Sequence, residues 1–112
     1  MLAWATEHRV AVVPFGGGTA ARRAGSAGLV SLALVRLDAL LRVDPESRTA
    51  VLQAGMRGPA AEAALAEHGF TLGHFPQSFE FASIGGFAAT RSSGQASAGF
   101  GRFDDMVVGL RV

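Results

Sequence analysis

The sequence contains no cysteine, no lysine and no tyrosine. Without cysteine there can be no disulfide, thiol nucleophile, cysteine-ligated zinc or iron–sulfur cluster. Without lysine there is neither a Walker A phosphate-binding amine nor a Schiff base. His8, His68 and His74 do not follow a metal-binding spacing such as H-E-x-x-H, and no serine stands in a G-x-S-x-G elbow. We therefore expect no catalytic residue and no metal site in this chain, so that any chemistry has to come from a bound cofactor.

The composition is that of a folded protein with few charges. Hydrophobic residues make up 49% of the 112 residues, charged residues make up 17%, and the formal net charge is +1. This is typical of one globular domain or a piece of a larger one. The arginines, such as Arg9, Arg57 and Arg111, are scattered, which argues against a nucleic-acid surface. No apolar run approaches the roughly 20 residues of a membrane span, and the N-terminus lacks the pattern of a secretory signal.

Periodicity and turn residues predict short alternating elements. Residues 1–8 resemble the tail of a helix whose beginning lies outside this chain, and 9–13 and 29–35 read as buried strands, the first ended by Pro14. The remaining expected elements are one helical turn at 36–40, a hairpin of 41–44 and 49–54, a helix from Pro59 stopped by Gly69, a helix over 84–89, a loop at 95–103, and a strand over 106–112.

One stretch, residues 73–94, concentrates glycines, aromatics and hydroxyls. Glycine lets a backbone approach a ligand closely, and hydroxyl and free N–H groups can donate to an anion. Ser83 reads as the N-cap of the helix over 84–89, which would aim unpaired helix N–H groups at a ligand. The alternative is a Gly/Ser-rich surface loop, which the many phenylalanines disfavour.

A second stretch places three consecutive glycines directly after a predicted strand, at residues 16–18. A strand that runs into a glycine-rich turn is a recurring way to wrap a phosphate or pyrophosphate with backbone N–H groups. The spacing is not the G-x-G-x-x-G of a Rossmann turn, so a nicotinamide site is not predicted. A flexible turn is the alternative.

Together the two stretches resemble the FAD-linked oxidases of the vanillyl-alcohol-oxidase type, which have a PCMH-type FAD-binding domain. Residues 14–19 are similar to the P-x-G-G-G-T-S loop of that family, and 73–86 and 90–94 to its second flavin-contacting region. Within the family the chain is most similar to alkyldihydroxyacetonephosphate synthases, whose version reads G-H-E-P-D-S-L-E-F-S-T-V-G-G followed by T-R-A-S-G. The likeness continues through Gly101, Asp105 and Val107-Val108.

The resemblance implies an α+β fold, part of a PCMH-type domain in which the flavin lies between two small α/β subdomains. Residues 1–112 would be that domain, incomplete at both ends and without the substrate domain. The glycine loop would wrap the FAD pyrophosphate, and the second region would contact pyrophosphate, ribitol and isoalloxazine. The implied cofactor-binding residues are Pro14, Phe15, Gly16, Gly17, Gly18, Thr19, Ala20, Gln77, Ser78, Phe79, Glu80, Phe81, Ala82, Ser83, Thr90, Arg91, Ser92 and Ser93.

Two positions depart from the family pattern. Ala20 stands where the family usually has serine, and Gln77 where it usually has aspartate. We expect weaker or altered contacts there rather than loss of the site. The first loop has no histidine that could tether the flavin, so the implied FAD is non-covalent.

The resemblance also implies a function for the full-length protein. It would be an FAD-dependent enzyme of ether-lipid synthesis that exchanges acyl for alkyl on dihydroxyacetone phosphate through a flavin adduct. One alternative is an FAD-linked dehydrogenase or oxidase of a 2-hydroxy acid such as D-lactate or glycolate. Another is a non-catalytic remnant with weak or no FAD binding. We expect the chain alone to be inactive.

The expected surroundings follow from the same resemblance. The substrate would be a small or lipid-derived molecule, and no nucleic acid is expected as a partner. A homodimer of the full-length enzyme, and its association with a membrane, are left open. The absence of cysteine and of a signal sequence favours the cytoplasm.

Overall fold

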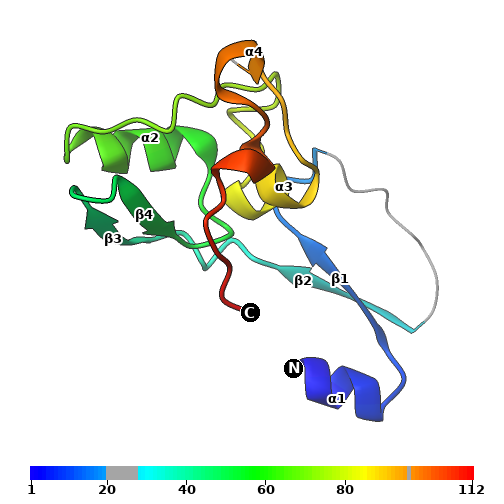
Figure 1. Ribbon diagram of the computed structural model, residues 1–112. Coiled ribbons are helices and arrows are strands. Elements are labelled where there is room, and N and C mark those ends of the chain that lie inside the picture. The colour runs from blue at the N-terminus through cyan, green and yellow to red at the C-terminus, as the bar shows by residue number, and fades with distance from the viewer. Residues whose placement is uncertain (20–27, 96) are drawn as a thin grey trace.

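The computed structural model describes residues 1–19, 28–95 and 97–112 (Figure 1). Within these ranges the fold is α+β, as predicted, with two separate two-stranded sheets and short helices. The elements in chain order are α1 (Leu2–Glu7), β1 (Ala11–Phe15), β2 (Leu29–Ala33), β3 (Leu40–Asp44), β4 (Thr49–Leu52), α2 (Gly58–Ala66), α3 (Ile84–Ala89), α4 (Ser97–Phe100) and the 3-10 helix η1 (Phe103–Met106). Among the described residues no helix is both long and apolar enough to span a bilayer.

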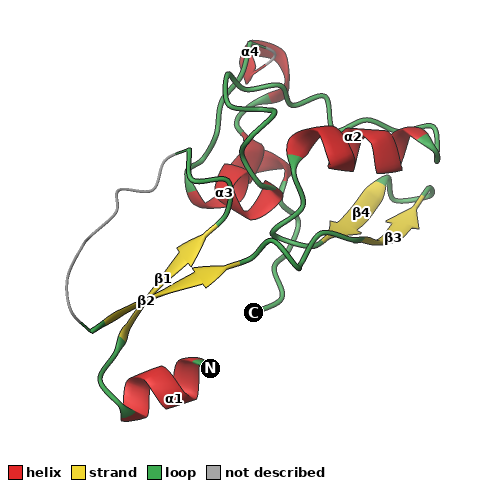
Figure 2. Ribbon diagram, turned by 180° about the vertical axis from the view of Figure 1, so that it is seen from behind, coloured by secondary structure: helices red, strands yellow, loops and turns green. Residues whose placement is uncertain are grey.

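Strands β1 and β2 form a parallel ribbon that projects from the rest of the chain and has α1 at its far end (Figures 1 and 2). The predicted end of the first strand at Pro14 is wrong, because Pro14 lies within β1 opposite Leu32. Proline is tolerated there because an edge strand can leave one N–H position unused. The prediction that both strands are buried is also wrong, since every residue of the ribbon is half-buried or exposed.

Strands β3 and β4 form the predicted antiparallel hairpin. Its turn is fixed locally, because the Asp44 carboxylate accepts the N–H groups of Glu46 at 3.0 Å and Ser47 at 3.3 Å. The helical turn expected at 36–40 is wrong. The chain instead makes a turn in which Leu37 N–H donates to Leu34 C=O. The N–H and C=O groups of Ala39 are both bonded to Gln53, so they are not available for helical hydrogen bonds.

Helix α2 lies over the hairpin and begins with Pro59 in its first turn, as predicted (Figure 2). Gly69 follows its end at φ +76°, a conformation that glycine adopts without the cost a Cβ would add. The main core forms where α2, α3 and η1 meet. Its buried residues are Met56, Ala61, Ala82, Ile84, Phe87 and Phe103.

The C-terminal part differs from its prediction. The strand expected over 106–112 is absent, and the chain instead forms η1 and then continues without regular structure. An apolar run becomes a strand only when a neighbouring strand pairs with it, and none of the described residues pairs with 107–112. The loop expected at 95–103 contains the four-residue helix α4.

Candidate functional site

The two glycine-containing stretches, far apart in the sequence, lie against each other. A Cβ added at Gly16 would collide with the Ser83 hydroxyl, and one added at Gly17 would collide with the Phe81 carbonyl. Glycine is therefore required at both positions for the backbones to approach this closely. Between the stretches is a cavity of about 330 Å³, which we call the hollow. Its volume is at the lower end of the range of about 300–1,000 Å³ found for ligand pockets.

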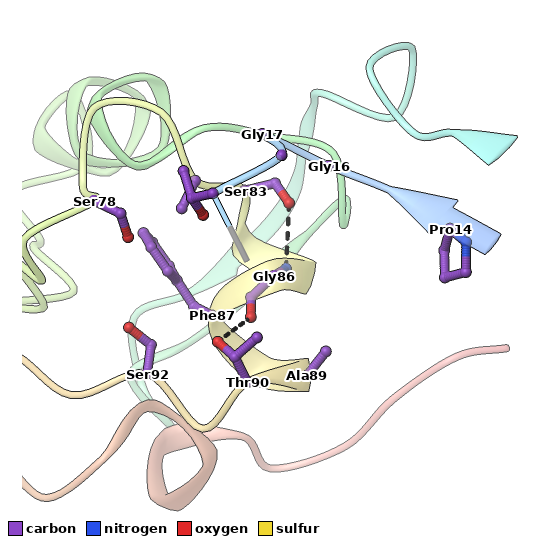
Figure 3. Close-up of a pocket in the computed structure, with 13 residues that line it drawn as sticks. Pro14, Gly16, Gly17, Ser78, Ser83, Gly86, Phe87, Ala89, Thr90 and Ser92 are labelled. Carbon is purple, nitrogen blue, oxygen red and sulfur yellow. Dashed lines mark hydrogen bonds between the residues drawn. The ribbon is translucent and has the colours of Figure 1, made fainter. Parts of the chain in front are cut away.

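The hollow takes its walls from four parts of the chain (Figure 3). These are the end of β1, the turn of residues 16–19 (the glycine turn), the segment 78–83, and α3 with the residues that follow it. The lining residues are Pro14, Gly16, Gly17, Gly18, Thr19, Ser78, Ala82, Ser83, Gly86, Phe87, Ala89, Thr90 and Ser92.

Backbone donors come from the glycine turn. In the described part of the chain, no hydrogen bond uses the backbone N–H groups of residues 16–19. Gly18 has φ +75°, and a Cβ added at Gly18 would lie 2.8 Å from the Phe15 ring, so this ring packs against the turn. Successive free N–H groups in a turn with a left-handed residue make a concavity that suits an anion.

Helix α3 does not provide the free N–H groups that the sequence suggested. The N–H groups of Ile84 and Gly85 donate to the carbonyls of Met56 and Ala54, each at 2.8 Å. Ser83 is the predicted N-cap, and its Oγ accepts from Gly86 N–H at 3.2 Å (Figure 3). The prediction of unpaired helix donors is therefore wrong, because packing against residues 54–56 has already used them.

The hydroxyls around the hollow differ in what they can still offer. Ser83 Oγ uses a lone pair to accept from Gly86, so its own hydrogen is free to donate. Thr90 Oγ1 donates to the Gly86 carbonyl at 2.8 Å, so only its lone pairs remain. Ser78 and Ser92 turn their oxygens toward each other in Figure 3, and Ser92 Oγ lies 3.1 Å from His74 Nε2.

The structure brings ten of the predicted cofactor-binding residues to the hollow. The ten are Pro14, Gly16, Gly17, Gly18, Thr19, Ser78, Ala82, Ser83, Thr90 and Ser92. Gln77 and Ser93 line a second, more open depression with Phe75, Gly94 and Gln95. Ala20 lies outside the described residues.

The remaining predicted residues do not line either depression. Phe15 and Phe81 support the glycine turn, the first through its ring and the second through its carbonyl. Phe79 packs its ring against Gly58 and lies 5.0 Å from the Phe75 ring. Glu80 is exposed. Arg91 is engaged with Asp104 at 2.7 Å, and this ion pair lowers the pKa of the Asp104 carboxyl.

Sequence reasoning missed three lining residues, Gly86, Phe87 and Ala89, and one residue just behind the lining, His74. Gly86, Ala89 and Thr90 follow Ser83 at helical spacing, so one face of the predicted helix already contained them. Nothing local marks His74, because its position depends on the distant Ser92, Phe87 and Phe103.

The donor set fits a diphosphate. The lining includes four successive backbone N–H groups and the free hydroxyl hydrogen of Ser83, and no carboxylate lines the hollow within residues 1–19, 28–95 and 97–112. An anion in the hollow would thus meet hydrogen-bond donors and, from these described residues, no negatively charged side chain. The lining residues that the structure describes include no cation either, so the donors that they offer to an anion are backbone and hydroxyl dipoles.

Comparisons with known proteins find a matching family model and similar enzymes. The family model described as FAD binding domain matches residues 1–112. Alkyldihydroxyacetonephosphate synthase from Trypanosoma brucei brucei is 36% identical over 115 residues, which is 96% of this chain and 19% of that protein. D-2-hydroxyglutarate dehydrogenase from Xanthomonas citri pv. viticola is 35% identical over 114 residues, 97% of this chain and 24% of that protein.

The fold is also found in a solved structure of alkyldihydroxyacetonephosphate synthase. The TM-score is 0.86 at 38% identity, and the match covers 93% of this chain and 21% of the other. The chain thus spans about a fifth of the length of the synthases to which it is similar.

Proposed function

The chain belongs to the FAD binding domain family, and on that premise we propose that it binds the diphosphate of FAD in the hollow. The observation that carries this proposal is the contact of Gly16 with Ser83 and of Gly17 with Phe81. This contact places the free N–H groups of the glycine turn and the free Ser83 hydroxyl around one cavity. The departure at Gln77 lies in the second depression and is not among the residues that supply these donors.

The chain would contribute orientation rather than reactive groups. Among the described residues, the hollow contains no nucleophile more reactive than a serine or threonine hydroxyl, and the base recorded beside those hydroxyls is His74, next to Ser92. FAD, when bound, supplies the chemistry that the side chains lack. We expect the FAD to be held without a covalent bond.

The full-length protein would then be an enzyme of ether-lipid synthesis like alkyldihydroxyacetonephosphate synthase, which replaces an acyl with an alkyl group on dihydroxyacetone phosphate. The 36% and 38% identities over nearly the whole chain support this reading. A 2-hydroxy-acid dehydrogenase is the second candidate, supported by the 35% identity to D-2-hydroxyglutarate dehydrogenase. Product analysis of the full-length protein separates them, since the first forms an ether lipid and the second reduces its flavin with a hydroxy acid.

FAD binding itself is tested by unfolding the chain in urea with and without FAD. A ligand that binds only the folded state stabilises it by about 2.7 kcal/mol at a hundredfold excess over the dissociation constant. FMN, which lacks the diphosphate bridge, is the matched control and should stabilise far less. If saturating FAD leaves the unfolding midpoint of a correctly folded chain unchanged, the proposal fails and the chain is a remnant without cofactor binding.

A further inference from the structure

His74 is buried directly behind the hollow, at 4% exposure. Its ring centroid lies 5.2 Å from that of Phe87 and 5.1 Å from that of Phe103. The polar contact of the imidazole is with Ser92, whose Oγ is 3.1 Å from Nε2. Ser92 lines the hollow, so the imidazole reaches the site through this hydroxyl.

The charge of the imidazole follows from its surroundings. Burial lowers the pKa of His74, so the ring is neutral at neutral pH and has a single N–H. If that hydrogen is on Nε2, the ring donates to Ser92 Oγ and the Ser92 hydrogen is free to point elsewhere. If it is on Nδ1, Ser92 donates to the ring and presents lone pairs to the hollow.

The other hydroxyls of the hollow favour the first arrangement. Thr90 has already used its hydrogen on the Gly86 carbonyl. A second hydroxyl with lone pairs facing the hollow would add to the repulsion of an anion. A Ser92 that accepts from His74 can donate, as Ser83 can.

We propose that His74 is a positioning residue that donates from Nε2 to Ser92 and so directs the Ser92 hydroxyl as a donor toward the diphosphate in the hollow. The part that concerns the diphosphate rests on the proposed function. The contact between His74 Nε2 and Ser92 Oγ stands on the geometry of the chain itself, whereas its direction is argued from an anion in the hollow and so rests on the proposed function as well. His74 itself touches no ligand in this arrangement.

The first test locates the ring hydrogen in the protein without FAD. Nitrogen NMR of the ¹⁵N-labelled imidazole distinguishes the two neutral tautomers. We expect the hydrogen on Nε2, and we expect Ser92→Ala to shift the Nε2 resonance far more than Nδ1. A hydrogen on Nδ1, or a spectrum that Ser92→Ala leaves unchanged, overturns the proposal even if the protein binds no FAD.

The second test measures FAD affinity in His74→Gln and His74→Phe. Glutamine can place an amide donor near the position of Nε2, whereas phenylalanine fills the volume without a donor. We expect His74→Gln to stay within about twofold of the wild type and His74→Phe to bind about three- to tenfold more weakly, the range of one net hydrogen bond. Equal affinities for the two variants would contradict a role as donor.

Ser92→Ala tests whether His74 affects FAD affinity through the Ser92 hydroxyl. If His74 acts through the Ser92 hydroxyl, the difference between His74→Gln and His74→Phe disappears in the Ser92→Ala background. If the difference persists there, His74 acts on the site by packing alone and the positioning role is wrong. Loss of FAD binding in every form, including the wild type, refutes the proposed function, and the nitrogen spectra then decide the hydrogen bond.

Discussion

Gly17 lies with its Cα against the backbone carbonyl of Phe81. A Cβ at Gly17 would overlap the carbonyl oxygen, and it would lie 2.6 Å from the carbonyl carbon and 3.0 Å from Ala82 Cα. All of these are backbone atoms, so no side chain can rotate away to make room. The contact joins the part of the chain that carries the β1–β2 ribbon to the part that carries α3, and the hollow exists because of it.

Gly17→Ala should therefore separate the two walls of the hollow. We expect the free energy of unfolding to fall by about 1–3 kcal/mol, the usual cost of adding a methyl group to a packed site. FAD affinity should fall at least about tenfold, because the N–H groups would move away from the Ser83 hydroxyl. Urea unfolding and FAD titration measure the two effects.

Gly109→Ala is the control for that substitution. A Cβ at Gly109 would have no atom of the described residues within 4 Å, and Gly109 is exposed. This variant should change stability by no more than about 0.5 kcal/mol and leave FAD affinity alone. Equal behaviour of the two variants would mean that the close approach at Gly17 is not required.

The features that the sequence predicted correctly are those fixed by neighbouring residues. The Asp44 carboxylate fixes the hairpin turn through nearby N–H groups, and Ser83 caps α3 because its hydroxyl reaches the N–H three residues along the chain. The glycine turn and the capped helix were each recognisable alone. Their joint role was suggested by a resemblance to a family, since no local rule brings Gly16 to Ser83.

The features that could not be predicted depend on distant partners. The N–H groups of Ile84 and Gly85 are used by Met56 and Ala54, and nothing in residues 83–89 indicates this. Residues 106–112 have the composition of a strand but no strand beside them among the described residues.

Glu62 is predicted to stabilise the turn that leads into the site. Its Oε1 accepts from the N–H groups of Leu72 at 3.0 Å and Gly73 at 3.2 Å, and its Oε2 accepts from Thr71 Oγ1 at 2.7 Å. Glu62→Ala should lower the free energy of unfolding by about 1.5–3 kcal/mol, because a charged acceptor for two backbone donors is lost. Urea denaturation measures this.

The matched control for Glu62 is Glu67→Ala, which removes a carboxylate just after the end of the same helix. Glu67 is exposed, and its side chain makes no hydrogen bond within the described ranges. Its replacement should leave stability unchanged or raise it slightly, since a negative charge near a helix C-terminus is unfavourable. Losses of equal size at both positions would refute a specific role for Glu62.

The buried His74 should make stability depend on pH. Burial lowers its pKa below the ordinary value of 6.5, so between that value and its folded-state pKa the unfolded chain binds more protons. The free energy of unfolding should then decrease as the pH falls below about 6.5 through this window. Urea unfolding from about pH 8 to about pH 5 measures the slope.

His74→Gln should remove that part of the slope, because glutamine does not titrate. His68→Gln, at an exposed position after α2, should retain the wild-type slope. Arg91 lowers the pKa of the Asp104 carboxyl, so this group affects stability only at lower pH. Its stabilising effect is lost as the pH falls below about 3.8. An unchanged slope in His74→Gln would show that the buried imidazole is not its source.

Charge introduced at Ala89 tests whether the hollow holds the anionic part of FAD. Ala89 is exposed and lines the hollow, and none of the lining residues in the described part of the chain is charged. In a largely solvated site, two unit charges a few ångströms apart interact by about 1 kcal/mol. Ala89→Arg should therefore strengthen FAD binding about fivefold and Ala89→Glu should weaken it about fivefold. Both effects should shrink as salt is raised, because screening acts over about 10 Å at 0.1 M.

The same two substitutions at Ala66, exposed at the end of α2 and absent from the lining, are the control for Ala89. They should leave FAD affinity unchanged while altering the net charge by the same amount. The comparison separates the effect of a charge beside the hollow from the effect of the net charge of the whole protein. If arginine and glutamate at Ala89 give the same affinity and salt dependence, the diphosphate does not lie in the hollow. The donors of the glycine turn would then need a different partner.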